Sequence, residues 1–166
     1  NGYARAVPDS AFAEFVCHDK ADAHDLMQKT SFRSLIFIRQ WSRGVFLELP
    51  EQDRINPLLE LLADYPVCGS LWLEVADTNE GKELSGFCRK FEKPLRSALI
   101  KAGRLVESEK RLRLILTFMS GRKVFVGLAN PVNSSSWPMG IILLKFPREA
   151  PSRSTLKLEE AWHTFI

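Results

Sequence analysis

Residues 71–99, LWLEVADTNEGKELSGFCRKFEKPLRSAL, decide the fold class of this chain. Residues 71–76 are apolar enough for a largely buried strand, and the Asp-Thr-Asn that follows supplies turn and helix-capping side chains. From residue 84 to residue 99, apolar side chains recur at helical spacing on one side, and basic side chains fall on the other. A buried strand followed by a long amphipathic helix predicts a domain of mixed strands and helices.

Pro94 falls inside this helical pattern. A proline has no backbone N–H, and its ring collides with the preceding turn of a helix. We therefore expect two consecutive helices here, with a bend between them.

The residues nearest the N-terminus predict short elements. Residues 3–7 and 11–17 are β-prone and are separated by Pro-Asp-Ser, so we expect them to pair as a hairpin. Asp19 can cap a helix that runs to about residue 29, and residues 34–40 are interpreted as a further strand. The inward side of that helix would be formed by Ala21, Ala23 and Leu26.

The middle of the chain joins these elements to the central stretch. Residues 45–49 are predicted to form another strand or a continuation of the one at residues 34–40, and Pro50 introduces a helix near residues 53–65. The apolar stripe of this helix consists of Ile55, Leu58, Leu59 and Leu62. The mixed order of elements, with mostly antiparallel pairing, predicts an α+β architecture of two small units that meet near Pro50.

On the C-terminal side, the pattern predicts a β-hairpin with a basic tip. Residues 112–118 and 124–128 are apolar and flank Met-Ser-Gly-Arg-Lys. A polar loop over residues 130–138 then leads to a predicted strand at residues 141–146. Ser154 can cap a final helix. The apolar side chains of that helix are Leu156, Leu158 and Trp162.

The composition is that of a globular protein, with 45% apolar and 26% charged residues among 166. The chain has no apolar run of about 18 residues and no secretory signal pattern at its N-terminus. Cys17, Cys68 and Cys88 are odd in number and widely spaced, which fits neither a disulfide framework nor a zinc site. We therefore expect a soluble protein of the reducing cytoplasm.

Basic residues are concentrated in one part of the chain. From Lys82 to Lys123 there are 12 Lys or Arg and 4 Asp or Glu, and the rest of the chain has a net charge of −5. Such a cluster is typical of a polyanion-binding surface, and equally of a solvated face. Lys and Arg neutralise RNA phosphates, so the basic helix face and the hairpin tip together are a candidate RNA clamp. The candidate RNA-binding residues are Lys82, Arg89, Lys90, Lys93, Arg96, Arg122, Lys123 and Arg153.

The polar loop adds one candidate for contact with a base. Trp137 is placed either to stack on an unpaired base or to fill a hydrophobic edge beside its neighbouring proline. Asn130, Asn133 and Ser134 of the same loop are equally interpretable as turn formers.

Catalytic motifs are few. No glycine-rich loop follows a strand and opens a helix, so no cofactor site of the doubly wound kind is visible. His18, His24 and His163 have no pattern for zinc or for a nucleophile-base pair, and we interpret them as structural. The tetrapeptide at residues 43–46, Arg-Gly-Val-Phe, is weakly similar to the phosphate loop of acylphosphatases, which share an α+β sheet.

Residues 151–161, PSRSTLKLEEA, form the most specific stretch. They resemble the first helix of FtsJ-like ribose 2′-O-methyltransferases, whose Ser-Arg-Ser/Ala-x-x-Lys-Leu-x-Glu pattern carries the first lysine of a Lys-Asp-Lys-Glu catalytic set. Lys157 occupies the matching position. Other stretches resemble, in order, the THUMP-containing bacterial 23S rRNA cytidine 2′-O-methyltransferases of the Rlm M type. These stretches are SLIFIRQ (34–40), EVADTNE (74–80), KEL (82–84), FCRKF (87–91), PLR (94–96) and LKFP (144–147).

The resemblance implies three parts: a ferredoxin-like domain at residues 1–50, a THUMP domain at 51–146 that recruits RNA, and, at 147–166, a linker with the first helix of a Rossmann-like methyltransferase domain. It implies that the complete enzyme transfers a methyl group from S-adenosylmethionine to a cytidine ribose hydroxyl of 23S rRNA. Lys157 would take or guide the hydroxyl proton, which a lysine with a lowered pKa can do.

Two departures from the family pattern limit what this chain is expected to do. It begins where the second ferredoxin strand would lie, so we expect an unpaired sheet edge that invites self-association. It ends before the glycine-rich cofactor loop and the remaining Asp, Lys and Glu of the catalytic set. We therefore expect no methyl transfer and no binding of S-adenosylmethionine, metal or membrane by this chain, and Lys157 would behave as a surface lysine.

Two other classes of function stay open at this point. A stand-alone ferredoxin-like domain that binds a small molecule or an acyl phosphate predicts a structured pocket near Arg43. A protein-interaction adaptor predicts that the basic surface is buried against an acidic partner.

Overall fold

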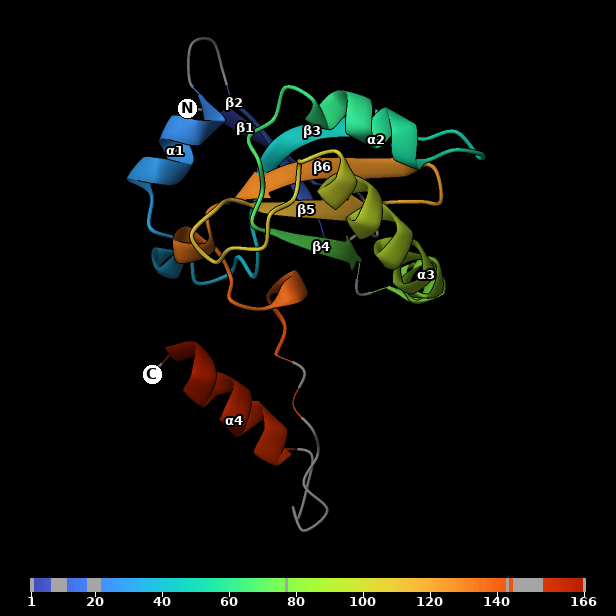
Figure 1. The fold of residues 1–166 in the computed structure, drawn as a ribbon. Helices are drawn as coiled ribbons and strands as arrows, with labels where there is room; N and C mark the ends of the chain where they lie inside the picture. The colour runs from blue at the N-terminus through green and yellow to red at the C-terminus, as the bar shows by residue number, and fades with distance from the viewer. Residues whose placement is uncertain are drawn as a thin grey trace.

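The structure is a computed structural model that describes residues 2–6, 12–17, 22–76, 78–142, 144 and 154–165 (Figure 1). The strands are β1 (Gly2–Ala6), β2 (Ala13–Cys17), β3 (Arg43–Glu48), β4 (Ser70–Val75), β5 (Arg113–Phe118) and β6 (Lys123–Ala129). The α-helices are α1 (Ala23–Lys29), α2 (Ile55–Leu62), α3 (Asn79–Lys101) and α4 (Ser154–Phe165). Three short 3-10 helices are η1 (Phe32–Ser34), η2 (Pro131–Asn133) and η3 (Pro138–Gly140). The predicted α+β class is confirmed.

A four-stranded sheet with the order β3-β6-β5-β4 organises residues 43–129. β5 and β6 form the predicted hairpin, and β3 pairs antiparallel with β6, from Arg43 opposite Leu128 to Glu48 opposite Lys123. β4 and β5 are parallel, so the chain must cross the length of the sheet between them, and α3 makes this crossing. Because β3 precedes Pro50, the sheet draws on residues from both sides of the boundary expected there.

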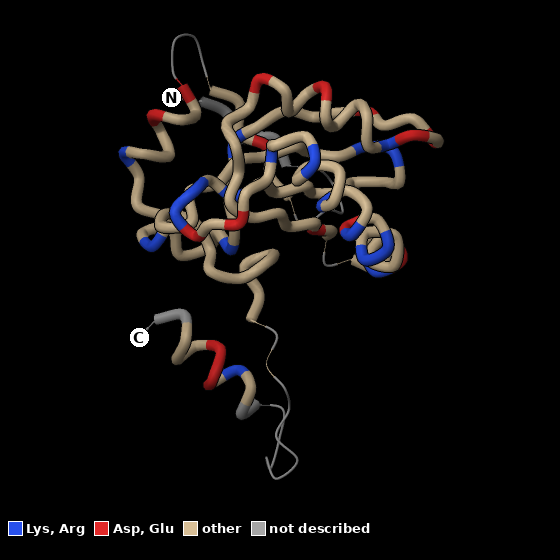
Figure 2. Tube along the Cα trace, in the orientation of Figure 1, with Lys and Arg blue, Asp and Glu red and all other residues tan. Residues whose placement is uncertain are grey.

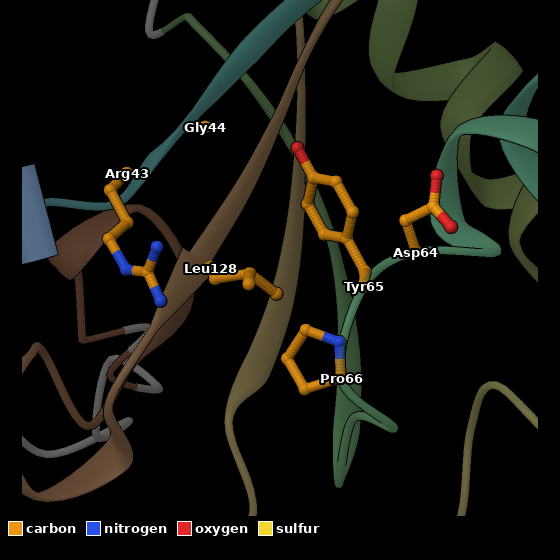
Figure 3. Close-up of a pocket in the computed structure, with 6 residues that line it drawn as sticks. All are labelled: Arg43, Gly44, Asp64, Tyr65, Pro66 and Leu128. Carbon is orange, nitrogen blue, oxygen red and sulfur yellow. The ribbon is translucent and has the colours of Figure 1, made fainter.

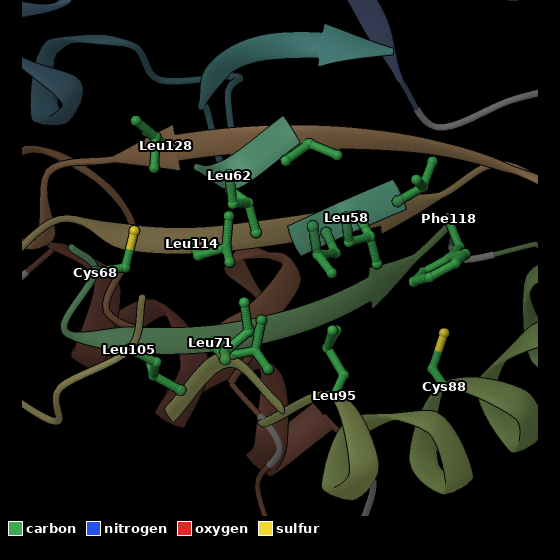
Figure 4. Packing of buried hydrophobic residues seen from close by; sticks show 14 of the residues in the cluster. Leu58, Leu62, Cys68, Leu71, Cys88, Leu95, Leu105, Leu114, Phe118 and Leu128 are labelled. Carbon is green, nitrogen blue, oxygen red and sulfur yellow. The ribbon is translucent and has the colours of Figure 1, made fainter. Parts of the chain in front are cut away.

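The helices α2 and α3 cover one face of the sheet, and the hydrophobic core lies between the two layers (Figures 1 and 4). Every residue of β5 is buried, as expected for a central strand. Leu58 and Leu62 of α2 are buried, and Ile55 and Leu59 pack against the core. The apolar stripe predicted for this helix is therefore confirmed.

One continuous helix of 23 residues forms α3, although Pro94 lies inside it. The Thr78 side chain caps the helix by accepting a hydrogen bond from the Gly81 N–H at 3.1 Å. The prediction of two consecutive helices is wrong: the proline removes one backbone hydrogen bond, but packing holds the helix on its C-terminal side, where Leu95 and Leu99 are fully buried. Figure 1 shows that the helix axis changes direction along its length.

The other face of the sheet carries two buried charged side chains, Glu74 on β4 and Arg113 on β5. The loop after β6 covers them: the Met139 N–H donates to Glu74 Oε1 at 2.7 Å, and the Arg113 guanidinium donates to the Ser135 carbonyl at 2.7 Å. Arg113 also lies over the Trp72 ring, with its guanidinium carbon 3.4 Å from the ring centroid. These contacts fasten the loop to the sheet.

The N-terminal elements are small. β1 and β2 form the predicted antiparallel hairpin, and each has one strand partner among the described residues. Asp22, and not Asp19, caps α1, because its carboxylate accepts a hydrogen bond from the His24 N–H at 2.8 Å. Asp19 and Ala21 lie outside the described residues. Leu26 is 52% exposed, so the prediction that it faces inward is wrong.

The strand predicted over residues 34–40 does not form. The 3-10 turn η1 is followed by turns and irregular backbone up to β3. Ile36 and Phe37 are 75% and 96% exposed. Both ends of this segment are instead held against the loop after β6, because the Phe32 N–H and the Trp41 indole both donate to Asn133.

Asn133 in η2 ties the segment after α1 to the loop after β6. Its side-chain amide nitrogen donates to the carbonyls of Met27 and Thr30 at 2.6 and 2.9 Å, and its side-chain oxygen accepts from the Phe32 N–H at 2.8 Å. The Trp41 indole donates to the Asn133 carbonyl at 2.6 Å. One side chain thus connects segments about 100 positions apart.

The region after β6 departs from prediction in part. Ile141, Ile142 and Leu144 are not in a strand, so the strand predicted at residues 141–146 is wrong at these positions, and the others lie outside the described residues. The predicted final helix is present as α4, but Leu158 and Trp162 are 73% and 61% exposed. Within the described part of the chain, no helix is long and apolar enough to cross a membrane.

The packing of α3 predicts a stability difference between two leucine substitutions. Leu95→Ala should lower the free energy of unfolding by about 2–5 kcal/mol, because it leaves a cavity under a fully buried side chain. Leu158→Ala, at a position 73% exposed, should change it by less than about 0.5 kcal/mol. Urea unfolding of both variants measures the difference. Equal effects would contradict the packing described here.

The buried Glu74 predicts a dependence of stability on pH. Burial raises the pKa of its carboxyl from the ordinary value of 4.5, and the Met139 amide and Arg113 only partly oppose the shift. A group whose pKa is higher in the folded than in the unfolded protein stabilises the fold at pH values below its unfolded-state pKa. This stabilisation is lost as the pH rises through its folded-state pKa. Glu74→Gln keeps a hydrogen-bond acceptor and removes the titration. The stability of the parent relative to this variant should therefore fall as the pH rises from 4 towards neutrality. Unfolding titrations across this range provide the measurement, and a relative stability that rises with pH would contradict the prediction.

Candidate nucleic-acid interface

Four of the predicted RNA-binding residues lie exposed on α3: Lys82, Arg89, Lys90 and Lys93. We call this set the α3 face. It forms because the apolar positions of the helix, among them Cys88 and Leu95, are buried against the sheet. Lys82, Arg89 and Lys93 are seven and four positions apart, so they follow one side of the helix. Figure 2 shows Lys and Arg positions gathered along α3.

The cations of the α3 face have no carboxylate partner. Among the described residues, none of the four takes part in an ion pair. Arg89 makes one long contact, from its Nε to the Ser85 carbonyl at 3.4 Å. The charged ends are therefore available to an anion from solution.

Arg96 differs from its neighbours on α3. Its guanidinium is 2.9 Å from the Glu92 carboxylate and 3.4 Å from that of Glu107, and it donates to the Leu71 carbonyl at 3.2 Å. These contacts join α3 to β4. The positive charge of Arg96 is balanced by carboxylates of the protein itself. The spacing of Glu92, four positions earlier, is the signal in the sequence that marks this residue as engaged.

The tip of the β5–β6 hairpin contributes Arg122 and Lys123. Because Val75 pairs with Phe118, the end of β4, the start of α3 and this tip lie at one end of the sheet. Arg122 lies 3.9 Å from Glu51 in an exposed and weak ion pair, and Lys123 Nζ lies 4.9 Å from the centroid of the Phe46 ring. Both side chains stay exposed.

Among the described residues, Lys157 and Trp137 form no hydrogen bond or ion pair with the α3 face or the hairpin tip. Lys157 is exposed on α4. Arg153 lies outside the described residues. Trp137 is partly buried and precedes η3, where its N–H donates to Ser135 Oγ at 3.1 Å. Asn130 caps η2 by accepting from the Val132 N–H at 3.0 Å, so its role as a turn former is confirmed.

Residues 43–46 form part of strand β3 and not a phosphate loop. A Cβ at Gly44 would lie 1.8 Å from the Val126 carbonyl oxygen, so this glycine allows close approach of two strands. The similarity to acylphosphatases is therefore not supported by the backbone.

Two hollows nevertheless adjoin Arg43. The smaller, about 280 Å³, is shown in Figure 3, where Arg43 and Tyr65 flank Leu128. Burial raises the pKa of the Tyr65 phenol, and the positive charge of Arg43 opposes the shift. The larger hollow, about 670 Å³, lies between α1 and the loop after β6. The larger hollow could not be predicted from periodicity or motifs, because its walls come from segments about 100 positions apart.

The turn from β4 into α3 joins a strand to a helix, as cofactor loops do, but a Cβ at Gly81 would lie 1.9 Å from the Ala76 carbonyl oxygen. That glycine therefore allows the start of α3 to pack closely against the end of β4. Within the described ranges, no group of three His, Cys, Asp or Glu side chains is placed to hold a metal ion.

Comparison with known proteins identifies the family. The model "Ribosomal RNA large subunit methyltransferase M, N-terminal" matches residues 53–130, and the model "RlmM ferredoxin-like domain" matches residues 1–42. Proteins named ribosomal RNA large subunit methyltransferase M from Azotobacter vinelandii and Pseudomonas entomophila are 69% and 70% identical to this chain over 165 residues. Each match covers 99% of this chain and 47% of the relative, so the chain spans about half the length of the curated relatives it matches. The predicted resemblance is confirmed, and the chain belongs to the family of ribosomal RNA large subunit methyltransferase M, whose N-terminal region it matches.

Proposed function

We propose that this chain binds and positions ribosomal RNA for an enzyme that methylates it. The observation that carries the proposal is the α3 face, a row of exposed cations that form no ion pair with any carboxylate in the described part of the chain. From Lys82 to Lys93 the row is about 16 Å long, at about 1.5 Å per helical residue. RNA phosphates match such a row, and the name of the relatives specifies large-subunit ribosomal RNA as their substrate.

Binding through this face would depend mainly on charge. Each Lys or Arg that neutralises a phosphate releases a counterion, so affinity falls as the salt concentration rises. Contacts of this kind fix the position of the RNA but do not read its sequence. The α3 face therefore supports recruitment and placement, and selection of one nucleotide would need other contacts.

In a protein of the relatives' full length, we propose methyl transfer from S-adenosylmethionine to a cytidine ribose 2′-hydroxyl of 23S rRNA in the cytoplasm. The cofactor supplies the methyl group. Lys157 of this chain would guide the hydroxyl proton, as the matching lysine of the FtsJ-like pattern implies.

We also propose a division into a ferredoxin-like domain, a THUMP domain and the first helix of the methyltransferase domain, near residues 1–50, 51–146 and 147–166. The matches of the two family models, over residues 1–42 and 53–130, support a division in this part of the chain. The pairing of β3 with β6 favours a join just before Arg43.

The α3 face predicts a specific loss of RNA affinity. Arg89→Glu with Lys93→Glu should weaken binding to many RNA sequences alike and reduce the slope of log affinity against log salt by about 0.7–0.9 for each lost phosphate contact. Fluorescence anisotropy at three salt concentrations measures both effects. The matched control is Lys101→Glu with Lys110→Glu, which makes the same change of charge at exposed positions elsewhere. Equal weakening by both pairs would mean that net charge, and not the α3 face, determines binding.

The role of Lys157 predicts a different result in a protein of the relatives' full length. Lys157→Met should lower methyl transfer about 10²- to 10⁴-fold, the range typical of general acid–base catalysis, and leave RNA affinity unchanged. Incorporation of labelled methyl groups into rRNA measures the first, and anisotropy the second. Retention of near-parental activity would exclude Lys157 from proton transfer.

A further inference from the structure

The larger hollow differs in chemistry from the α3 face. Its described lining includes the cations Lys29 and Arg43 and the imidazole of His24, and no Asp or Glu. Lys29 pairs with Asp25 at 3.7 Å, but both side chains are more than half exposed, so this pair is weak. Arg43 is partly buried and has no ion pair among the described residues. The hollow therefore presents positive charge that is not balanced within it.

The walls of the hollow are held in place. Asn133 uses both polar atoms of its side chain on the backbone at Met27, Thr30 and Phe32, which fixes the end of α1 to the loop after β6. Leu128 belongs to a strand paired on both edges. A ligand would thus meet a formed cavity, so little of its binding energy would be lost in ordering the protein.

Apolar and polar groups share the lining. Met27, Leu112 and Leu128 offer apolar surface to the flat side of a base, and Asn130 and the hydroxyls of Thr30 and Ser31 lie at the same hollow. A volume of about 670 Å³ falls in the range of about 300–1,000 Å³ typical of small-molecule sites. A base within a duplex cannot enter such a cavity, but an unpaired base can be splayed out and stacked.

We propose that this hollow binds an unpaired nucleotide of a single-stranded RNA segment, with the base against Met27 and Leu128 and the phosphate near Lys29 and Arg43. The proposal rests on the proposed RNA-binding function and deepens it, because it specifies single-stranded RNA. The α3 face would hold the backbone, and the hollow would hold a base.

The three methionines of the chain allow a direct test. Met27 lines the hollow, Met119 lies at the tip of the β5–β6 hairpin, and Met139 lies in η3. In protein labelled at the methionine methyl groups, the NMR signals therefore report separately on the hollow, the hairpin tip and η3. The probes are a five-nucleotide single-stranded RNA, a blunt RNA duplex, cytidine monophosphate and inorganic phosphate. We expect the single strand and the mononucleotide to shift the Met27 signal, and the duplex and inorganic phosphate to leave it unchanged.

The variant for this test is Lys29→Gln with Arg43→Gln, and the control is Lys101→Gln with Lys110→Gln, which removes the same charge at exposed positions elsewhere. The double variant should bind the single strand about tenfold more weakly and the duplex nearly as well as the parent does. Lys29→Gln alone, at an exposed position, provides a second variant if the change at Arg43 prevents folding, and should weaken single-strand binding in the same direction.

The outcomes separate the two proposals. Binding of RNA with no shift of the Met27 signal would overturn the hollow as a nucleotide site and leave the α3 face intact. A Met27 shift produced equally by inorganic phosphate would also overturn it, in favour of a simple anion site. Absence of binding to any RNA would overturn the proposed function itself. Loss of single-strand binding in the control equal to that in the double variant would show a general effect of charge and would contradict the inference.

Discussion

The backbone of β6 is hydrogen-bonded on both edges, to β3 on one side and to β5 on the other, and the arrangement of the remaining elements depends on this double pairing. The β5–β6 pairing is local and closes a hairpin. The β3–β6 pairing joins residues 43–48 to residues 123–128, so it brings the segment around α1 next to the loop after β6. Asn133 can then bond to that segment, and Arg43 comes to lie opposite Leu128. The larger hollow is a product of the same pairing.

Elements determined by nearby residues were predicted well from the sequence. The strand β4, the Thr78 cap, the amphipathic side of α3, the apolar stripe of α2 and the basic β5–β6 hairpin all depend on periodicity or turn chemistry over a few positions. The strand predicted at residues 34–40 failed for a reason outside its own composition. These residues are suited to a strand, but hydrogen bonds from Phe32 and Trp41 to Asn133 hold the segment against the loop after β6. Pro94 shows the opposite case, since burial of Leu95 and Leu99 holds a helix together across a residue that disfavours it.

In the candidate nucleic-acid interface, too, features set by nearby residues were predicted and contacts between distant residues were not. Charge and helical spacing were enough to predict which cations of α3 would be exposed, and Lys82, Arg89, Lys90 and Lys93 are. They were not enough to show which cations the protein itself uses, because Arg96 contacts Glu107 and the Leu71 carbonyl from distant parts of the chain. Asn133 was interpreted as a turn former, yet its side chain links two segments that no periodicity connects. Contacts between distant residues are set by the fold as a whole, so a single sequence gives little information about them.

The pairing of β3 with β6 also has a consequence for how the protein is made. About 75 residues separate the end of β3 from the start of β6, so at a synthesis rate of roughly 5–20 residues per second β3 waits about 4–15 s for its partner. During that interval Val45, Phe46 and Leu47 leave the ribosome beside an unpaired strand edge. The edge of β3 that later pairs with β6 therefore stays open to pairing with another chain until the residues of β6 have emerged.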